Sequence, residues 1–275
     1  MAEITPIDSH NHDITANLDT PGARFDRWWL LVIGDIALIV LLVTLVPDPF
    51  MRILQFVSDG IGVTLEVTII SFILIVFIGL LGGLGRLSKN RVINGISTLY
   101  VEVIRGIPLL VQLLFWYFAF TALIKNLGAA INFAPFNNFS PDPIGMAIMG
   151  LTICYGAYMS EIYRAGIQSI GKGQMEAARS LGMSSFQAMR FVILPQAIRV
   201  VLPPMGNEFI SLLKDSSLVS VVAVADLTRR GREFMSQTGA SFETWAIVAM
   251  IYLVMTIFSA RMVNLIEKKT RTTER

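Results

Sequence analysis

The chain has 275 residues, of which 54% are hydrophobic and 15% are charged, and its formal net charge is +2. Soluble domains carry about 25% charged residues, so this composition excludes a soluble globular protein and indicates an all-α, polytopic membrane protein. The single cysteine, Cys154, excludes an intrachain disulfide, and its apolar surroundings indicate a small buried side chain.

The first 27 residues are polar and show no apolar periodicity. They lack a basic segment followed by an apolar one, so we expect no cleavable signal peptide. His10 and His12 stand two positions apart, but no ordered scaffold is indicated that would present them to a metal ion. We therefore expect residues 1–27 to form a disordered cytoplasmic tail without a metal site.

Six apolar segments follow, each near the roughly 20 residues that a helix needs to cross the hydrocarbon core. We expect membrane spans over residues 28–46, 60–84, 96–124, 144–163, 200–222 and 244–265. Trp28, Trp29 and Trp245 stand at span ends, where interfacial aromatic residues concentrate. We expect loops over residues 125–143 and 223–243. The spacing of Gly79 and Gly83 predicts that another helix approaches the second span closely.

The distribution of basic residues predicts the orientation of these spans, because cytoplasmic loops carry an excess of Lys and Arg. Fifteen basic residues fall on the side of both termini, the 85–95 loop and the 164–199 segment: Arg24, Arg27, Arg86, Lys89, Arg91, Arg164, Lys172, Arg179, Arg190, Arg199, Arg261, Lys268, Lys269, Arg271 and Arg275. Five fall on the other side: Arg52, Lys125, Arg229, Arg230 and Arg232. We therefore expect both termini to be cytoplasmic, with residues 266–275 as a basic cytoplasmic tail.

The only long polar interruption in the C-terminal half runs from residue 171 to residue 195. We expect a short helix over residues 175–181, ended by Gly182, and a second helix that Ser184 or Ser185 opens as N-cap. Pro195 is expected to limit this second helix, because its ring cannot continue the backbone ladder. Two short helices that meet at a glycine form a compact knob, which suits docking by a soluble partner.

Sequence blocks in and around this knob resemble those of a known family. Glu176-Ala177-Ala178, Gly182 after three residues, and Val192-Ile193-Leu194-Pro195 after nine more residues resemble the EAA loop of ABC importer permeases. The blocks YVEVIRGIPLLVQ (100–112), GAYMSEIYRAG (156–166), GKGQ (171–174), LPQA (194–197) and NEFISLLKDSSL (207–218) extend the likeness. Together they resemble permease subunits of polar amino acid ABC importers over roughly residues 60–265. The chain departs from the family pattern at Val192 for isoleucine, Ile107 for threonine and Ser216 for threonine.

The resemblance implies a five-helix permease domain over residues 60–265, to which the 28–46 span is an accessory addition. It also implies a multi-pass inner-membrane transport subunit, rather than an enzyme, with a polar amino acid as substrate and membrane lipid around it. The expected partners are two ATP-binding cassette subunits, a second permease, identical or homologous, and a periplasmic or lipid-anchored solute-binding protein. No nucleic acid partner is expected. The EAA residues expected to couple the chain to the ATPase, within the 164–199 loop, are Glu176, Ala177, Ala178, Gly182, Met183 and Ser184.

No Walker A sequence occurs in the chain, so it cannot bind ATP by that route. We expect ATP and Mg to lie on the partner ATPase and no cofactor to lie on this chain.

Ionisable residues at membrane depth are costly and need partners or a function. Glu102 and Arg105 are three residues apart, as are Glu161 and Arg164, so we expect each pair to form a structural ion pair along one helix. Glu66 is more isolated, and the sequence leaves open whether it lines a pathway or approaches the outer interface.

The fifth span carries a polar stripe made of Asn207, Glu208, Ser211 and Asp215. Seven residues separate the two carboxylates, almost two helical turns, which places them on one face with Ser211 between them. The stripe is open to two interpretations: a buried seam that holds helices together, or the lining of a translocation pathway that binds a substrate ammonium group. Lys214 lies about 100° to one side of Asp215. Two acidic groups favour basic or neutral polar amino acids weakly over acidic ones.

Two other function classes use some of the same residues. A secondary transporter or channel would use the intramembrane carboxylates for ion coupling and need no ATPase, but the EAA knob argues against it. A membrane enzyme is poorly supported, because neither H-E-x-x-H nor G-x-S-x-G occurs.

Overall fold

The structure, a computed structural model, describes residues 28–271. Every regular element in this range is a helix. Five of them are long and apolar enough to cross a membrane: Pro47–Arg86, Leu109–Ala130, Pro143–Gln168, Ser185–Val222 and Ser241–Lys269. The remaining expected span is the apolar helix α1 (Trp28–Leu45). The expected tail over residues 1–27 and the last four residues of the expected C-terminal tail lie outside the described residues.

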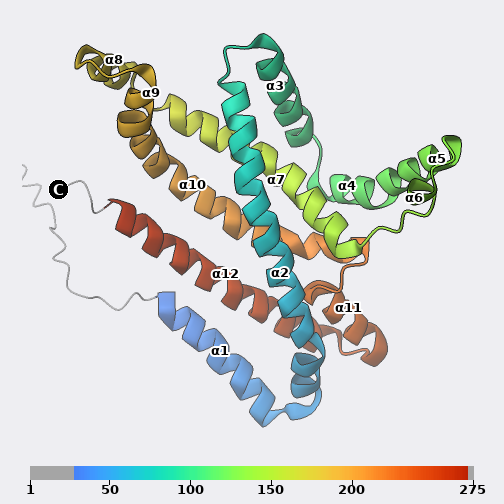
Figure 1. The fold of residues 1–275 in the computed structure, drawn as a ribbon. Helices are drawn as coiled ribbons and strands as arrows, with labels where there is room; N and C mark the ends of the chain where they lie inside the picture. The colour runs from blue at the N-terminus through green and yellow to red at the C-terminus, as the bar shows by residue number, and fades with distance from the viewer. Residues whose placement is uncertain (1–27, 272–275) are drawn as a thin grey trace, which may run out of the picture.

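The first two helices show where the expected boundaries need correction. Helix α1 lies beside α12 (Ser241–Arg271) in Figure 1. Val32 and Val43 are the buried apolar residues of α1. Helix α2 runs from Pro47 to Arg86, so it starts earlier than the expected second span. The backbone is interrupted at Asp48, whose φ of -103° and ψ of 116° are extended, as is usual for a residue before a proline, so the continuous helix begins only after this residue.

The third span lies further along the chain than expected, because the helix breaks. Helix α3 (Arg91–Arg105) ends before Gly106-Ile107-Pro108, and α4 (Leu109–Leu114) leaves in a different direction (Figure 1). Proline disfavours helical backbone at the residue before it, which explains the break. The span is formed instead by α4, the π-helix η1 (Phe115–Phe120) and α5 (Thr121–Ala130). The expected loop over 125–143 therefore contains the end of α5 and the short α6 (Ala134–Asn137).

The second half of the chain contains two further corrections. After α7 (Pro143–Gln168) and α8 (Lys172–Ser180), helix α9 (Ser185–Ala188) continues through the π-helix η2 (Met189–Ile193) into α10 (Leu194–Asp215). Pro195 does not end the helix, because the wider π-helical turn before it makes room for a residue that cannot donate a hydrogen bond. Helix α10 passes into the 3₁₀ segment η3 (Ser216–Val222). The expected loop over 223–243 contains α11 (Leu227–Thr238).

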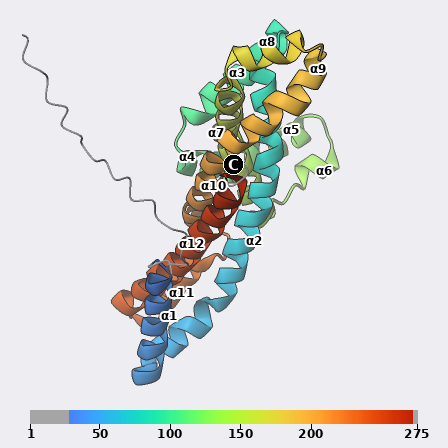
Figure 2. The same ribbon diagram turned by 90° about the vertical axis from the view of Figure 1, so that its left-hand side faces the viewer.

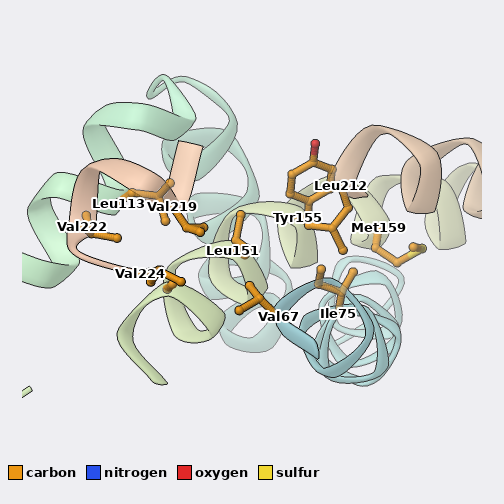
Figure 3. Close-up of a cluster of buried hydrophobic side chains, with 11 residues drawn as sticks. Val67, Ile75, Leu113, Leu151, Tyr155, Met159, Leu212, Val219, Val222 and Val224 are labelled. Atoms are coloured by element: carbon orange, nitrogen blue, oxygen red, sulfur yellow. The ribbon is translucent and has the colours of Figure 1, made fainter. Parts of the chain in front are cut away.

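The core lies where α2 crosses α7. Figure 3 shows Val67 and Ile75 of α2 beside Leu151, Tyr155 and Met159 of α7, with Leu212 of α10 on the other side. Small residues make the crossing close, as the glycine spacing predicted. A Cβ atom on Gly83 would lie 2.8 Å from Tyr163 Cβ and 2.9 Å from the Ser160 carbonyl oxygen. Figures 1 and 2 show that α8 and α9 project at one end of the elongated molecule, while α11 lies toward the opposite end.

Candidate functional site

A polar cavity of about 300 Å³ lies between the membrane-spanning helices. Its lining comes from α4, α7 and α10, and consists of Leu109, Cys154, Tyr155, Tyr158, Glu208, Ser211 and Asp215. The helical spacing of 3.6 residues per turn brings the three α10 residues of the lining onto one face. Three of the four residues of the predicted polar stripe therefore share one cavity.

Asn207 is the member of the stripe that does not line the cavity. Its side chain is exposed on the neighbouring face of α10, one residue before Glu208. Lys214 is likewise exposed outside the lining, whereas Leu212 and Leu213 are fully buried. The helix thus presents carboxylates to the cavity while its leucines pack elsewhere.

Tyr155 is the main lining residue that the sequence did not single out. Its hydroxyl donates a 2.7 Å hydrogen bond to Asp215 Oδ2, which joins α7 to α10. The ring packs in the hydrophobic core, and Figure 3 shows the hydroxyl pointing away from Val67 and Ile75. Tyr155 and Tyr158 stand three residues apart, with ring centroids 6.0 Å apart. Two tyrosines on one face of an apolar span were the available signal, because each brings a hydroxyl into the membrane.

The break between α3 and α4 is held by a buried glutamine. Gln112 Nε2 donates 2.8 Å hydrogen bonds to the carbonyl oxygens of both Ile104 and Ile107. These carbonyls lie at the end of α3 and in the turn, where the regular pattern of helical hydrogen bonds ends. Gln112 Nε2 also lies 3.4 Å from Cys154 Sγ, in the cavity lining. The turn is therefore fixed against α7, and Leu109, just after it, reaches the cavity.

The charged residues near the ends of α2, α3 and α7 form a cross-helix network. Arg164 Nε donates to Glu161 Oε2 at 3.0 Å within α7, the spacing at which a pair was expected. Arg86 of α2 approaches the same oxygen at 2.6 Å.

The expected pair between Glu102 and Arg105 is wrong. Glu102 lies 3.4 Å from Arg86 Nη2 instead, because the end of α2 passes α3 on the side that carries Glu102. Arg105 is the last residue of α3, and its guanidinium carbon lies 5.2 Å from the centre of the Tyr158 ring. The guanidinium is thus directed to α7 rather than back along its own helix.

The knob at the end of the molecule is formed by α8 and α9. Helix α8 begins at Lys172, earlier than expected, and Gly182 adopts a left-handed φ of 86° in the turn that follows. Ser184 then opens α9 with a capping box: its hydroxyl accepts from the Gln187 N–H at 3.2 Å, and Gln187 Oε1 accepts from the Ser184 N–H at 2.9 Å.

Of the residues predicted to meet a partner here, Glu176, Ala177, Gly182 and Ser184 are exposed and Met183 is half-buried. Ala178 is buried and packs inward. The knob also carries two large apolar side chains that the motif did not emphasise, Leu181 at 81% and Phe186 at 71% exposed. Apolar side chains in that state are typical of a surface that another protein covers.

Proteins similar to this chain include permeases of transport systems. Residues 75–272 match the family described as binding-protein-dependent transport system inner membrane component. The glutamine transport system permease protein GlnP of Escherichia coli K12 is 36% identical over 213 residues, which cover 78% of this chain and 92% of that protein. The L-cystine transport system permease protein TcyB of Bacillus subtilis is 37% identical over 220 residues, with 77% and 88% covered. A chain from the crystal structure of an amino acid ABC transporter with histidines is 39% identical with a TM-score of 0.70, and the match covers 80% of this chain and 96% of that one.

Apolar helices of membrane-spanning length around a polar cavity define this chain as a multi-pass membrane protein. It belongs to the family of binding-protein-dependent transport system inner membrane components.

Proposed function

We propose that this chain is the membrane-spanning permease subunit of an ATP-driven amino acid importer. The observation that carries the proposal is the cavity with two carboxylates, Glu208 and Asp215, between apolar membrane-spanning helices. A cavity with acceptor groups suits the ammonium group that every amino acid carries, because charge-assisted hydrogen bonds are the strong ones. A polar amino acid with a neutral or basic side chain fits this lining better than an acidic one.

The cavity residues that bind substrate in this proposal are Glu208, Asp215 and Ser211, with Tyr155 holding the Asp215 carboxylate in place. The Tyr155 hydroxyl uses one acceptor position of Asp215 and leaves the other oxygen free for a ligand. Ser211 lies between the two carboxylates along α10 and offers both a donor and an acceptor.

The knob formed by α8 and α9 is, in this proposal, the surface on which an ATPase subunit docks. Glu176, Ala177, Gly182 and Ser184 lie on its exposed side, and the excess of basic residues on this side of the spans supports a cytoplasmic location. Rigid short helices can transmit the movement of a docked partner to the spans, and α9 continues directly into α10, which lines the cavity.

The proposed assembly pairs this chain with a second permease, identical or homologous, and with two ATPase subunits that carry ATP and Mg. A solute-binding protein would deliver the amino acid at the opposite end, near α11. The names of the relatives support the transport of amino acids, since they are permeases of glutamine and cystine transport systems, and the family description as binding-protein-dependent supports the solute-binding partner.

The test is co-purification of the chain with its ATPase, followed by ATP-dependent amino acid uptake in proteoliposomes supplied with the solute-binding protein. Leu181→Glu is expected to abolish ATPase binding and uptake, because it places a charge at the centre of an apolar contact. Phe242→Glu is the matched control for ATPase binding alone, since Phe242 is also 81% exposed but lies at the start of α12, next to α11 and away from the knob. The proposal fails if uptake proceeds without ATP, or if both variants retain full ATPase binding and uptake.

A further inference from the structure

A guanidinium group without a carboxylate partner lies beside the cavity. Arg105 ends α3, and its guanidinium carbon lies 5.2 Å from the centre of the ring of Tyr158, which lines the cavity. Within residues 28–271, no ion pair joins Arg105 to an acidic side chain. The nearby candidates are engaged elsewhere: Glu102 by Arg86, and Glu161 by Arg86 and Arg164.

The backbone that carries Arg105 is held in place. Gln112, only 3% exposed, bonds the carbonyl oxygens of Ile104 and Ile107 on either side of it. The same turn carries Leu109 into the cavity lining. The backbone position of Arg105 therefore follows from a fixed helix break, and from there its side chain reaches the ring of Tyr158.

The cavity has carboxylates on α10 and a guanidinium group beside its α7 wall. The guanidinium of Arg105 lies against the ring of Tyr158, which lines the same cavity as Glu208, while Asp215 lies two turns beyond Glu208 along α10. Lys214, the other cation of this region, lies outside the lining and is exposed. Arg105 is thus a cation held against Tyr158, a residue of α7 that lines the cavity.

An α-amino acid carries an ammonium and a carboxylate on one carbon atom, so a site that holds both needs both signs of charge close together. We propose that Arg105 binds the α-carboxylate of the transported amino acid while Glu208 and Asp215 hold its ammonium group. This inference rests on the proposed function and names the group that completes its site. It makes Arg105 the residue that distinguishes amino acids from amines of the same shape.

The residue type matters to this assignment. The planar guanidinium donates two parallel hydrogen bonds to one carboxylate, and its face stays stacked on an aromatic ring while it does so. A lysine offers a point charge without this fork. Arg105→Lys is therefore expected to recover only part of the function that Arg105→Gln loses.

The experiment measures ligand binding to the purified permease–ATPase complex in detergent, with L-glutamine, L-histidine and L-arginine, each against its α-carboxamide. The carboxamides keep the ammonium group and the side chain but lack the carboxylate charge. In the unaltered complex, the amino acid that binds best should have an affinity at least tenfold higher than that of its carboxamide. In Arg105→Gln its affinity should fall about tenfold to a hundredfold, while the carboxamide changes less than threefold. Arg91→Gln, at the other end of α3, is the matched control and should change neither.

The outcomes separate this inference from the proposed function. If Arg105→Gln lowers the affinities for the amino acid and for its carboxamide equally, Arg105 has a structural role and the inference is overturned. Unchanged affinities for both ligands would overturn it as well. Glu208→Gln tests the site itself and should weaken both ligands, because both carry the ammonium group. If Glu208→Gln has no effect on either ligand, the proposed substrate site is wrong.

Discussion

The substitution Asp215→Asn tests the cavity most directly, because it removes a charge and almost nothing else. Asparagine has nearly the volume of aspartate, and its side-chain oxygen can still accept the hydrogen bond that Tyr155 donates at 2.7 Å. The contact between α7 and α10 should therefore survive. What the variant loses is the negative charge that the proposed site offers to the substrate ammonium group.

The expected magnitude follows from that single interaction. A hydrogen bond to a charged group contributes about 1.5–3 kcal/mol, which corresponds to a loss of affinity of roughly tenfold to hundredfold. Glu208→Gln should give an effect of the same order, since Glu208 lines the same cavity. Docking of the ATPase should be unchanged in both variants, because the knob of α8 and α9 lies at the end of the molecule (Figure 1).

The assay is amino acid binding to the purified permease–ATPase complex, measured together with thermal unfolding. Asp226→Asn is a control on a buried carboxylate outside the cavity. Asp226 is the N-cap of α11 and accepts hydrogen bonds from the N–H groups of Thr228 and Arg229 at 3.1 and 3.0 Å. In Asp226→Asn one of these two accepting oxygens becomes an NH₂ group, which cannot accept a hydrogen bond, so this variant should unfold at a lower temperature while it keeps its affinity for amino acids.

The reasoning is refuted by a specific combination of results. If Asp215→Asn and Glu208→Gln keep their affinities within twofold of the unaltered complex but unfold at lower temperature, the polar stripe of α10 is a structural seam. The cavity would then be a packing defect between helices and not a substrate site.

Three further predictions concern the fold. Removal of residues 1–46 should spare insertion, ATPase binding and uptake, because lipid can replace α1 against α12 at little cost; a truncated chain that inserts and binds the ATPase yet cannot transport would show that α1 belongs to the functional core. Gly83→Ala should destabilise the chain by about 1–3 kcal/mol through overpacking against α7, whereas Gly95→Ala, with open space around it, should be neutral or stabilising; equal melting temperatures of the two variants would contradict the close crossing. The hydrogen bond from Arg229 holds the pKa of Glu233 below its usual range, so this contact stabilises the fold above about pH 4.3 and the stabilisation is lost as the pH falls through the lower folded value. Glu233→Gln should therefore be less stable at pH 7 by about 1 kcal/mol or less, seen as a slightly lower unfolding temperature, and the difference should close as the pH falls through the lowered pKa of Glu233 in the folded state; a difference independent of pH would refute this.

Local rules explain why much of the chain could be predicted without a structure. Apolar length alone indicated the spans, because a helix must bury its backbone groups across the hydrocarbon core. The α10 stripe followed from helical periodicity, which places residues 208, 211 and 215 on one face in any straight helix. The capping of α9 by Ser184 and the turn at Gly182 also depend only on neighbouring residues.

Only the tertiary structure could show which side chains from different helices come into contact. The spacing of Glu102 and Arg105 predicts a pair within one helix, but Arg86, far away in the sequence, takes Glu102 because α2 and α3 pack together. The direction of the chain after Pro108, and therefore the position of the third span, depends on the packing of α4 against α7. Tyr155 belongs to the site only because α7 and α10 meet there. A sequence pattern describes the face of one helix, whereas a cavity is formed by faces of several helices, and their relative placement is set by packing over the whole chain.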